Sequence, residues 1–371
     1  MLELIEFTVT SRCNARCKMC HMWQRSDPDI PLEKIKEVLG SNSVKGSLIN
    51  LVLTGGEPTL RGDLPEIFND AFIHLPKLKY AVFFTNSLSP RLAQETAKRA
   101  AAYKEKSGRD DVTFTVSLSL DGIGRTHDSI RGIEGAFGRV MENFLGLKAI
   151  SKGSLFNVNF NFTVQRENIS EGGALAMLEA AEGALLPVTF PIVYGKDVFL
   201  NRDSADEWAV QDDEYREGAI RFYEEAVRRT ESGGLLIDNG AYYNQVLSQL
   251  KGGPRMLPCL YKEKKACVID ADGSVYLCEV TKESLAGNIY ERSFDEIWNS
   301  PEREAAYARM VRHCSNCFSC CVGSGRYQLK ETWRTGGVSG IAKLSLHEVR
   351  KRLKRVSRLI REYRYAVIPR L

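Results

Sequence analysis

The sequence predicts an α/β protein, a partial (β/α)6 barrel of the TIM type followed by a cysteine-rich α+β domain and a basic C-terminal helix. Three observations carry this prediction. Strand-like and helix-like segments alternate over residues 3–195, as in a parallel sheet with helical crossovers. Seven of the ten cysteines lie within residues 258–322. Residues 343–371 carry ten Lys and Arg against only Glu348 and Glu362.

The barrel elements follow one another at regular spacing. Helix 31–39 begins at a proline, a residue that fits the first turn of a helix. In barrels of this type ligands gather at the carboxyl ends of the strands. Four glycine-rich or polar clusters follow strand ends and should share one rim: the cysteine loop, 55–58, 85–87 and 119–122. The predicted strands are 4–10, 49–53, 80–85, 113–120, 157–164 and 188–193, and the helices are 31–39, 64–73, 91–106, 137–150 and 172–182.

Four regions are expected along the chain. Residues 1–195 form the barrel, and residues 196–257 form a helical bridge with an amphipathic helix at 212–229. The Gly-Gly-Pro run at 252–254 breaks the chain before the cysteine-rich domain, residues 258–325, which includes a hairpin at 268–278. Residues 340–371 form the basic amphipathic tail.

Composition limits the setting in which the chain works. With 43% apolar and 26% charged residues, its 371 residues have ordinary globular composition. The N-terminal run lacks a basic leader and no stretch approaches the apolar length of a membrane span. Ten cysteines without a secretory signal favour metal or redox chemistry in a reducing compartment, so we expect a cytoplasmic protein.

Three cysteines with the spacing C-x3-C-x2-C follow directly after the first predicted strand. Cys13, Cys17 and Cys20 would supply thiolates to three irons of a [4Fe–4S] cluster and leave the fourth iron open to a substrate or cofactor. A zinc site that takes a fourth ligand from elsewhere is the alternative, and the eight residues by themselves do not choose between them.

The motifs behind this loop resemble those of the radical S-adenosylmethionine (SAM) enzymes. The ordered combination of the cysteine loop, Gly-Gly-Glu-Pro at 55–58, Ser-Leu-Asp-Gly at 119–122 and Arg131-Gly132 covers residues 3–195, and it is far more specific than any single motif. The resemblance implies that the open iron binds SAM and that one electron cleaves it to a 5′-deoxyadenosyl radical, which takes a hydrogen atom from a substrate. A reduced flavodoxin or ferredoxin is the expected electron donor.

The resemblance also assigns SAM contacts to individual residues. Gly55, Gly56 and Glu57 of the Gly-Gly-Glu-Pro segment would meet the methionine amino group, because glycines allow close approach of the backbone. Arg131 would pair with the methionine carboxylate through its planar fork. Further polar contacts to the ribose or methionine are expected from Asn86, Ser119, Asp121 and Thr163. Taken singly, these motifs are ordinary turns and solvated charges.

One position departs from the family pattern. The family usually has an aromatic residue just before the third cysteine, near the adenine, whereas Met19 occupies that position here. A thioether can still cover a ring face, and His21 and Trp23 are further candidates for this contact.

The second group of cysteines resembles the SPASM and twitch extensions of radical SAM enzymes, which hold auxiliary [4Fe–4S] clusters. Cys259, Cys278, Cys314 and Cys317 would complete one cluster. Cys267, Cys320 and Cys321 remain as further ligands, and we favour two auxiliary clusters over one. A zinc ribbon is the alternative for such cysteine pairs, and one thiol of the Cys320–Cys321 pair is also a candidate hydrogen-atom donor.

The leading functional hypothesis is dehydrogenation or oxidative bond formation assisted by an auxiliary cluster. The alternatives are a radical epimerase with a cysteine hydrogen donor, a peptide-modifying maturase and a non-catalytic iron–sulfur scaffold. Small-molecule, sugar, lipid-linked and peptide substrates stay open, with peptides less favoured because the chain begins almost at its first strand. No catalytic acid or base is assigned, and Asp270, Asp272 and Glu279 are expected to serve the hairpin turn.

The basic tail has three interpretations. Its apolar residues recur every three or four positions from Leu346 to Tyr363 and form one helical stripe. Docking on the parent domain is favoured, and peripheral contact with the acidic inner membrane surface comes next. Nucleic acid is the least favoured partner, because the charges lack interleaved aromatic residues.

Overall fold

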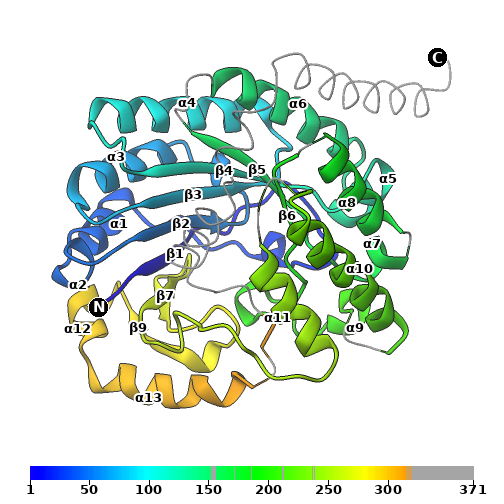
Figure 1. The fold of residues 1–371 in the computed structure, drawn as a ribbon. Coiled ribbons are helices and arrows are strands. Elements are labelled where there is room, and N and C mark those ends of the chain that lie inside the picture. Colours follow the sequence, from blue (N-terminus) through cyan, green and yellow to red (C-terminus); the bar gives the residue numbers. More distant parts are fainter. Residues whose placement is uncertain are drawn as a thin grey trace.

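The computed structural model describes residues 1–151, 156–170, 172–184, 186–210, 213–235, 237, 239–315 and 317–318. One sheet of nine strands organises this part of the chain, in the order β6-β5-β4-β3-β2-β1-β7-β8-β9 (Figure 1). The predicted basic helix at 340–371 lies outside the described residues, as do Cys320 and Cys321. Within the described ranges, no helix is long and apolar enough to cross a membrane.

The first six strands are parallel and neighbour one another in chain order, as expected for a partial barrel. The last two strands are shorter than predicted, and an isolated bridge between Val164 and Ile192 continues their pairing. Pro191 has no N–H to donate, which accounts for the interrupted ladder. The strands are β1 (Leu4–Thr10), β2 (Asn50–Gly55), β3 (Tyr80–Thr85), β4 (Thr113–Ser119), β5 (Asn157–Asn161) and β6 (Val188–Thr189).

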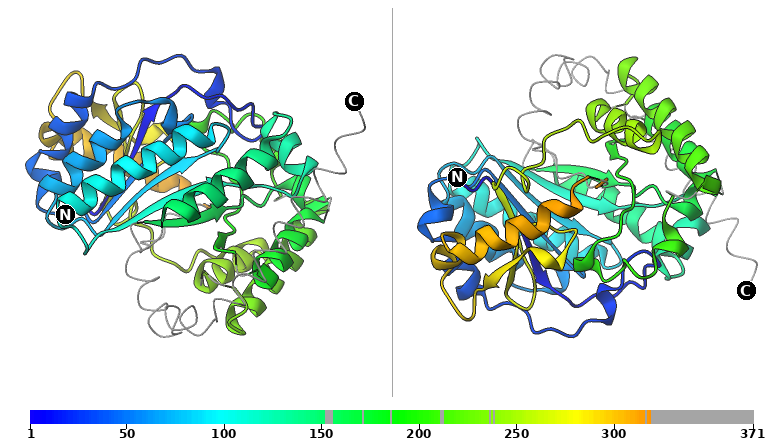
Figure 2. Two further views of the ribbon diagram at one scale, coloured as in Figure 1. Left: turned by 90° about the horizontal axis from the view of Figure 1, so that it is seen from above. Right: turned by 90° about the horizontal axis from the view of Figure 1, so that it is seen from below.

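Helices cover the outer face of these strands (Figures 1 and 2). Phe68 and Phe72 of α3 pack on the outward side chains Phe83 and Phe114, and the ring centroids of Phe68 and Phe114 are 5.0 Å apart. Because side chains alternate along a strand, the neighbours of these residues face the barrel interior. The helices are α1 (Leu32–Leu39), α2 (Asn42–Lys45), α3 (Leu64–His74), α4 (Pro90–Lys106), α5 (Arg125–Arg131), α6 (Ala136–Ile150), α7 (Arg166–Ser170) and α8 (Gly173–Ala184).

The bridge between the two cysteine groups contains α9 (Ala205–Trp208), α10 (Asp213–Glu231) and α11 (Gly240–Leu250). Tyrosines of α10 and α11 form hydrogen bonds with backbone groups just after β6. The hydroxyl of Tyr223 donates to the Phe190 carbonyl at 3.1 Å, and the hydroxyls of Tyr243 and Tyr242 accept from the N–H groups of Phe190 and Ile192 at 3.3 and 3.1 Å. These bonds occupy backbone groups that an edge strand would otherwise leave open.

The cysteine-rich region continues the barrel sheet. β7 (Ala266–Ile269) runs parallel to β1, with Ile5 opposite Cys267, and then β8 (Ser274–Tyr276) and β9 (Leu285–Asn288) add in antiparallel fashion. The β7–β8 pair is the predicted hairpin, and Gly273 at its turn has φ +81°. Two helices follow, α12 (Phe294–Trp298) and α13 (Pro301–Met310). Single 3-10 turns are η1 (Met22–Gln24), η2 (Pro58–Leu60), η3 (Asp197–Phe199), η4 (Lys282–Ser284) and η5 (Val311–His313).

Candidate active site

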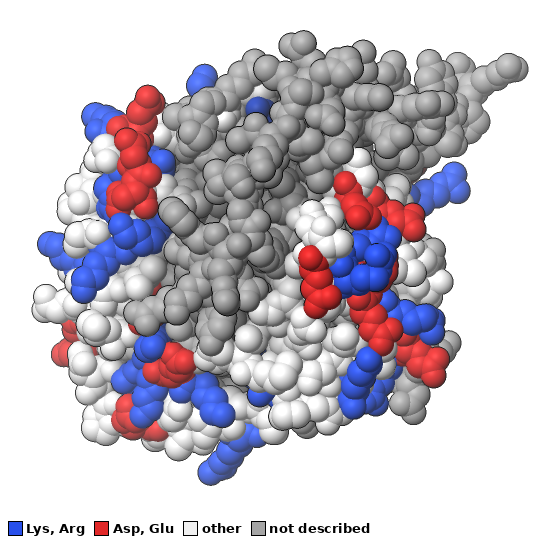
Figure 3. Space-filling view, in the orientation of Figure 1, with Lys and Arg blue, Asp and Glu red and all other residues white. Residues whose placement is uncertain are grey.

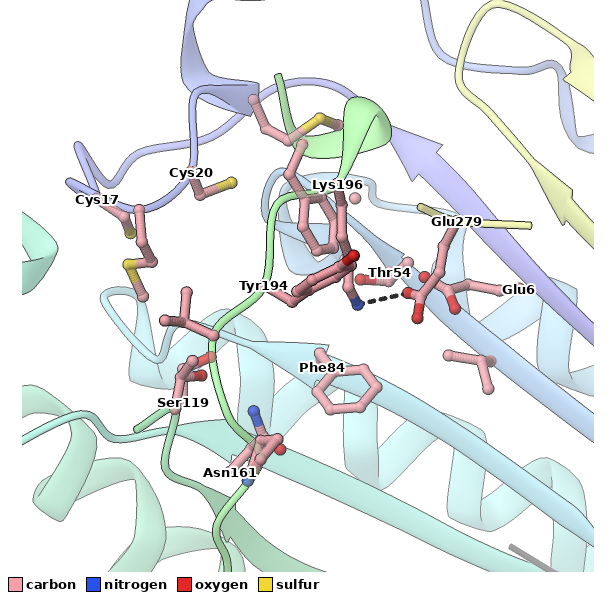
Figure 4. A pocket seen from close by; sticks show the side chains of 18 of the residues that line it. Glu6, Cys17, Cys20, Thr54, Phe84, Ser119, Asn161, Tyr194, Lys196 and Glu279 are labelled. Atoms are coloured by element: carbon pink, nitrogen blue, oxygen red, sulfur yellow. Dashed lines mark hydrogen bonds and ion pairs between the residues drawn. The ribbon is translucent and has the colours of Figure 1, made fainter. Parts of the chain in front are cut away.

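A cavity of about 560 Å³ opens inside the partial barrel and extends past the carboxyl ends of its strands (Figure 4). The three cysteines of the first loop line one end of it. The other end is lined by Leu260 and Glu279 of the cysteine-rich region and by Leu257, which directly precedes it. The barrel interior therefore connects the surroundings of the two cysteine groups.

The Gly-Gly-Glu-Pro segment holds the start of the cysteine loop. The N–H groups of Gly56 and Glu57 donate to the carbonyls of Thr10 and Arg12, both at 2.8 Å. A Cβ atom on Gly55 would lie 2.2 Å from the Thr10 carbonyl oxygen, and Gly55 has φ +134°. A Cβ atom on Gly56 would lie equally close to the Arg12 oxygen. Both glycines line the cavity, but their lack of a side chain is required by the approach of the cysteine loop.

Glu57 is placed differently from the expectation that it meets the methionine amino group. Its carboxylate is buried and accepts from the hydroxyls of Thr59 and Thr85 at 2.6 and 2.9 Å and from the N–H of Asn86 at 2.6 Å. Glu57 is not among the residues that line the cavity. These hydrogen bonds use both carboxylate oxygens and connect the ends of β2 and β3.

Arg131 ends α5 and faces the cavity beside the cysteine loop. Its guanidinium lies 2.5 Å from an Asp121 oxygen and donates to Cys17 Sγ at 3.5 Å. Within the described residues its Nε, which is buried, has no hydrogen-bond partner. The backbone nearby clamps the loop, since the N–H groups of Arg16 and Lys18 donate to the carbonyls of Arg131 and Ile130 at 2.9 and 3.0 Å.

Asp121, for which a contact with SAM is expected, is fully buried and is not among the residues that line the cavity. One of its oxygens accepts from the N–H of Thr163 at 2.9 Å, while the other lies against Arg131. The physical reason is that a carboxylate enclosed in the core needs a cation, and Arg131 is that cation. Asp121 therefore orients Arg131.

The remaining expected contacts are brought together. Asn86, Ser119 and Thr163 line the cavity, and Asn86 Nδ2 donates to the Asn14 side-chain oxygen at 2.8 Å, with Cys13 Sγ at 3.8 Å. These three residues, which the family resemblance assigns to SAM contacts, thus line the same cavity.

The candidate adenine contacts separate into two groups. Met19 and Trp23 line the cavity. The Nε1 atom of Trp23 is buried without a partner in the described part of the chain, and the Arg16 guanidinium lies 5.1 Å from the ring centroid. His21 is not among the lining residues, and its Nδ1 lies 3.0 Å from the Leu200 carbonyl oxygen.

The first cysteine loop fits a multi-iron cluster. Burial raises the pKa of Cys13 to about 11 and that of Cys20 to about 12, so the thiolates require a positive group to form. Within the described residues no three His, Cys, Asp or Glu side chains are arranged to hold a single metal ion. In an iron–sulfur cluster each thiolate binds a separate iron, so the sulfurs can stand further apart.

The second group brings together Cys259, Cys278, Cys314 and Cys317. Burial, followed by the charges of Glu279, Cys317 and Cys259, raises the pKa of Cys278 well above its usual value. Burial and Cys259 raise the pKa of Cys314 in the same way. The charges of Cys259 and Cys317 therefore act on Cys278, and that of Cys259 acts on Cys314, which fits the four-cysteine set expected for one cluster.

Cys267 does not join this group. It is completely buried in β7, opposite Ile5, and the one charge that acts on its thiol is that of Arg303. Its placement argues against the expected role as a cluster ligand. The cause is the alternation of the strand, which turns this side chain into the core while Cys278 lies beyond the end of β8.

Glu6, Lys196 and Glu279 form a charged group at the far end of the cavity that the sequence pattern did not reveal (Figure 4). Lys196 Nζ lies 2.6 Å from Glu279 Oε2, and the Tyr261 hydroxyl donates to Glu6 Oε2 at 3.5 Å. Glu279 was expected to serve the hairpin turn, but the turn contacts come from Asp270 and Asp272. A glutamate within the apolar strand 4–10 was the one signal for Glu6.

The fold and these two cysteine groups define a class, the partial-barrel enzymes that bind ligands at the carboxyl ends of parallel strands. A model of the radical SAM superfamily matches residues 7–172, and a model of the SPASM iron–sulfur cluster-binding domain matches residues 259–321. The chain belongs to the radical SAM superfamily and carries a SPASM domain. Its cofactors are SAM, a [4Fe–4S] cluster and auxiliary iron–sulfur clusters.

Several relatives align over most of the chain. Fe-coproporphyrin III synthase of Methanosarcina barkeri is 25% identical over 89% of this chain and 84% of its own length. Mycofactocin maturase MftC of Mycolicibacterium smegmatis is 26% identical over 86% and 76%. Among solved structures, anSMEcpe with bound AdoMet has a TM-score of 0.57 at 18% identity, covering 82% of each chain. Streptococcus suis SuiB bound to precursor peptide SuiA has a TM-score of 0.59 at 13% identity, covering 83% of this chain and 67% of SuiB. These structures share the fold.

Proposed function

We propose that this chain is an oxidative radical SAM enzyme, which removes a hydrogen atom from a substrate in the barrel cavity and passes the remaining electron to an auxiliary cluster. The observation that carries the proposal is the continuity of the cavity. Its lining includes Cys13, Cys17 and Cys20 at one end and Glu279, the neighbour of Cys278, at the other.

The site residues would act as follows. Cys13, Cys17 and Cys20 hold the cluster that binds SAM, and Arg131, oriented by Asp121, pairs with the methionine carboxylate. Bound in this way, the cofactors supply a carbon radical that abstracts hydrogen. Gly55 and Gly56 present their backbone to SAM, and further polar contacts come from Asn86, Ser119 and Thr163. Glu57 keeps the strand ends in register through Thr85 and Asn86.

The second cysteine group would hold the cluster that accepts the electron. Cys259, Cys278, Cys314 and Cys317 hold one auxiliary cluster within the domain proposed for residues 258–325. Cys320 and Cys321 belong to the same stretch of sequence and are the candidates for a second cluster.

The electrons and protons balance for a two-electron oxidation. The substrate loses one C–H hydrogen atom, which forms a C–H bond in 5′-deoxyadenosine, and one further electron, which goes to the auxiliary cluster. A proton leaves the substrate to a base or to solvent. One electron is needed to cleave each SAM, and a reduced flavodoxin or ferredoxin is the proposed donor.

Anaerobic turnover tests the proposal. The reconstituted protein, reduced in the presence of SAM, is expected to release 5′-deoxyadenosine, and a variant with Cys13, Cys17 and Cys20 changed to Ala is expected to release none. The matched control is Cys267→Ser, which should retain the activity because Cys267 lies in the core. Absence of 5′-deoxyadenosine from the wild-type protein would refute the radical chemistry.

Turnover in D2O separates oxidation from epimerisation. A product that is oxidised and carries no solvent deuterium at the attacked carbon supports the oxidative reaction. Deuterium at that carbon, with no change in the oxidation state of the substrate, would refute the oxidative reaction and indicate epimerisation with an exchangeable hydrogen donor.

A further inference from the structure

Among the described residues, two glutamates and one lysine line the far end of the cavity. Glu6 reaches it from β1, Glu279 from the segment after β8, and Lys196 from the segment after β6 (Figure 4). Of the described residues that line the cavity, Lys196 and Arg131 are the cations, and Arg131 is held by Asp121 at the opposite end. Two carboxyl groups therefore share one lysine.

These side chains are enclosed. The side chains of Glu279 and Lys196 are 7% and 15% exposed, and Lys196 Nζ lies 2.6 Å from Glu279 Oε2. Glu6 is half-buried, and its carboxylate accepts from the Tyr261 hydroxyl. Burial and the neighbouring Glu279 raise the pKa of Glu6 to about 8, while Lys196 acts in the opposite direction. A positive charge placed beside both carboxyl groups would offset their mutual repulsion and lower the pKa of Glu6.

Aromatic side chains form part of the wall between the two ends of the cavity, together with polar side chains such as Thr54 and Asn161 (Figure 4). Phe84 and Tyr194 flank the space between the cysteine loop and the charged group (Figure 4), and Tyr242 and Tyr261 also line it. The aromatic part of the wall suits a hydrophobic ligand body, whose orientation is then fixed by its polar groups. Glu6 and Glu279 would fix the end that lies furthest from the cysteine loop.

We propose that the substrate carries a cationic nitrogen, an ammonium or a related basic group, that binds between Glu6 and Glu279 while its reactive carbon points toward the cysteine loop. This inference rests on the proposed function, because it takes the cavity as the substrate site. It favours an amine-bearing substrate and disfavours one whose main charges are carboxylates, which Glu6 and Glu279 would repel.

A matched set of small probes tests the charge preference. Phenethylamine, 2-phenylethanol and phenylacetate share a ring and a two-carbon arm and differ in charge. Their binding to the anaerobic holoprotein with saturating SAM is measured by titration calorimetry. We expect the amine to bind at least about tenfold more tightly than the alcohol, as a buried charged contact implies, and the acid to bind most weakly.

Two variants locate the preference. Glu6→Gln should reduce the preference for the amine to about threefold or less, whereas Lys196→Met should increase it, because the Lys196–Glu279 ion pair would be lost. Unchanged iron content and SAM affinity show that each variant is folded. Equal binding of amine and alcohol to the wild type, or a preference that Glu6→Gln leaves unchanged, would overturn the inference.

The two proposals fail differently. Loss of the amine preference with normal release of 5′-deoxyadenosine overturns the substrate assignment alone. Absence of 5′-deoxyadenosine overturns the proposed function, whatever the probes show.

Discussion

Gly56→Ala should detach the cysteine loop from the barrel. The added Cβ would lie 2.2 Å from the Arg12 carbonyl oxygen and 2.6 Å from that of Ser11, whereas ordinary contacts begin near 3.4 Å. The two backbones must separate by about 1 Å, which disrupts the bonds from Gly56 and Glu57 to Thr10 and Arg12. Two lost hydrogen bonds at about 1 kcal/mol each, plus about 1–3 kcal/mol of overpacking, give about 3–5 kcal/mol.

Iron content and urea unfolding measure this effect. Gly56→Ala should lose about four irons per chain, because the displaced loop carries all three ligands of one cluster. Gly62→Ala is the matched control, since its Cβ would meet nothing within 4 Å and its stability should change by less than about 0.5 kcal/mol. Full iron content in Gly56→Ala, together with stability equal to that of Gly62→Ala, would refute the reasoning.

Three further predictions concern single groups. Cys278→Ala should lose about four irons and Cys267→Ser none, by iron analysis, and equal losses would contradict the different placement of these thiols. Arg131→Lys should weaken SAM binding about tenfold in calorimetry because the planar fork is lost, and unchanged affinity would exclude the proposed carboxylate contact. The pKa of Glu6 is raised from 4.5 to about 8 in the folded protein, so between these values the folded state binds more protons. The free energy of unfolding should therefore fall as pH rises through this window, by at most about 5 kcal/mol, and Glu6→Gln should remove that part of the slope in urea titrations at pH 5.5 and 8.

The sequence predicted the barrel well because its signals are local. Strand 4–10 and the helix that begins at Pro90 are marked by residue type and spacing, and the cysteine loop follows its strand directly. The rim position of Asn86, Ser119 and Thr163 follows from parallel strands, whose carboxyl ends meet at one edge.

Tertiary contacts determine the site features that the sequence did not predict. Glu57 and Asp121 belong to the predicted motifs, but long-range partners turn them away from the cavity: Thr85 and Asn86 for Glu57, and Arg131 for Asp121. The group of Glu6, Lys196 and Glu279 joins residues far apart in the chain, so no spacing rule predicts it. Cys267 was expected as a further cluster ligand, and the pairing of its strand with β1 is what places it in the core.

The pairing of β1 on both sides fixes which chemistry faces the cavity. Glu6 lies opposite Val52 on one neighbour and Val268 on the other, while Ile5 and Phe7 point into the apolar core. A shift of one residue would exchange these faces, bury the carboxyl group in the core and present apolar side chains to the cavity. Insertion or deletion of one residue in β1 would therefore change which side chains face the cavity, and with them the charge of the cavity, even though all other residues stay the same.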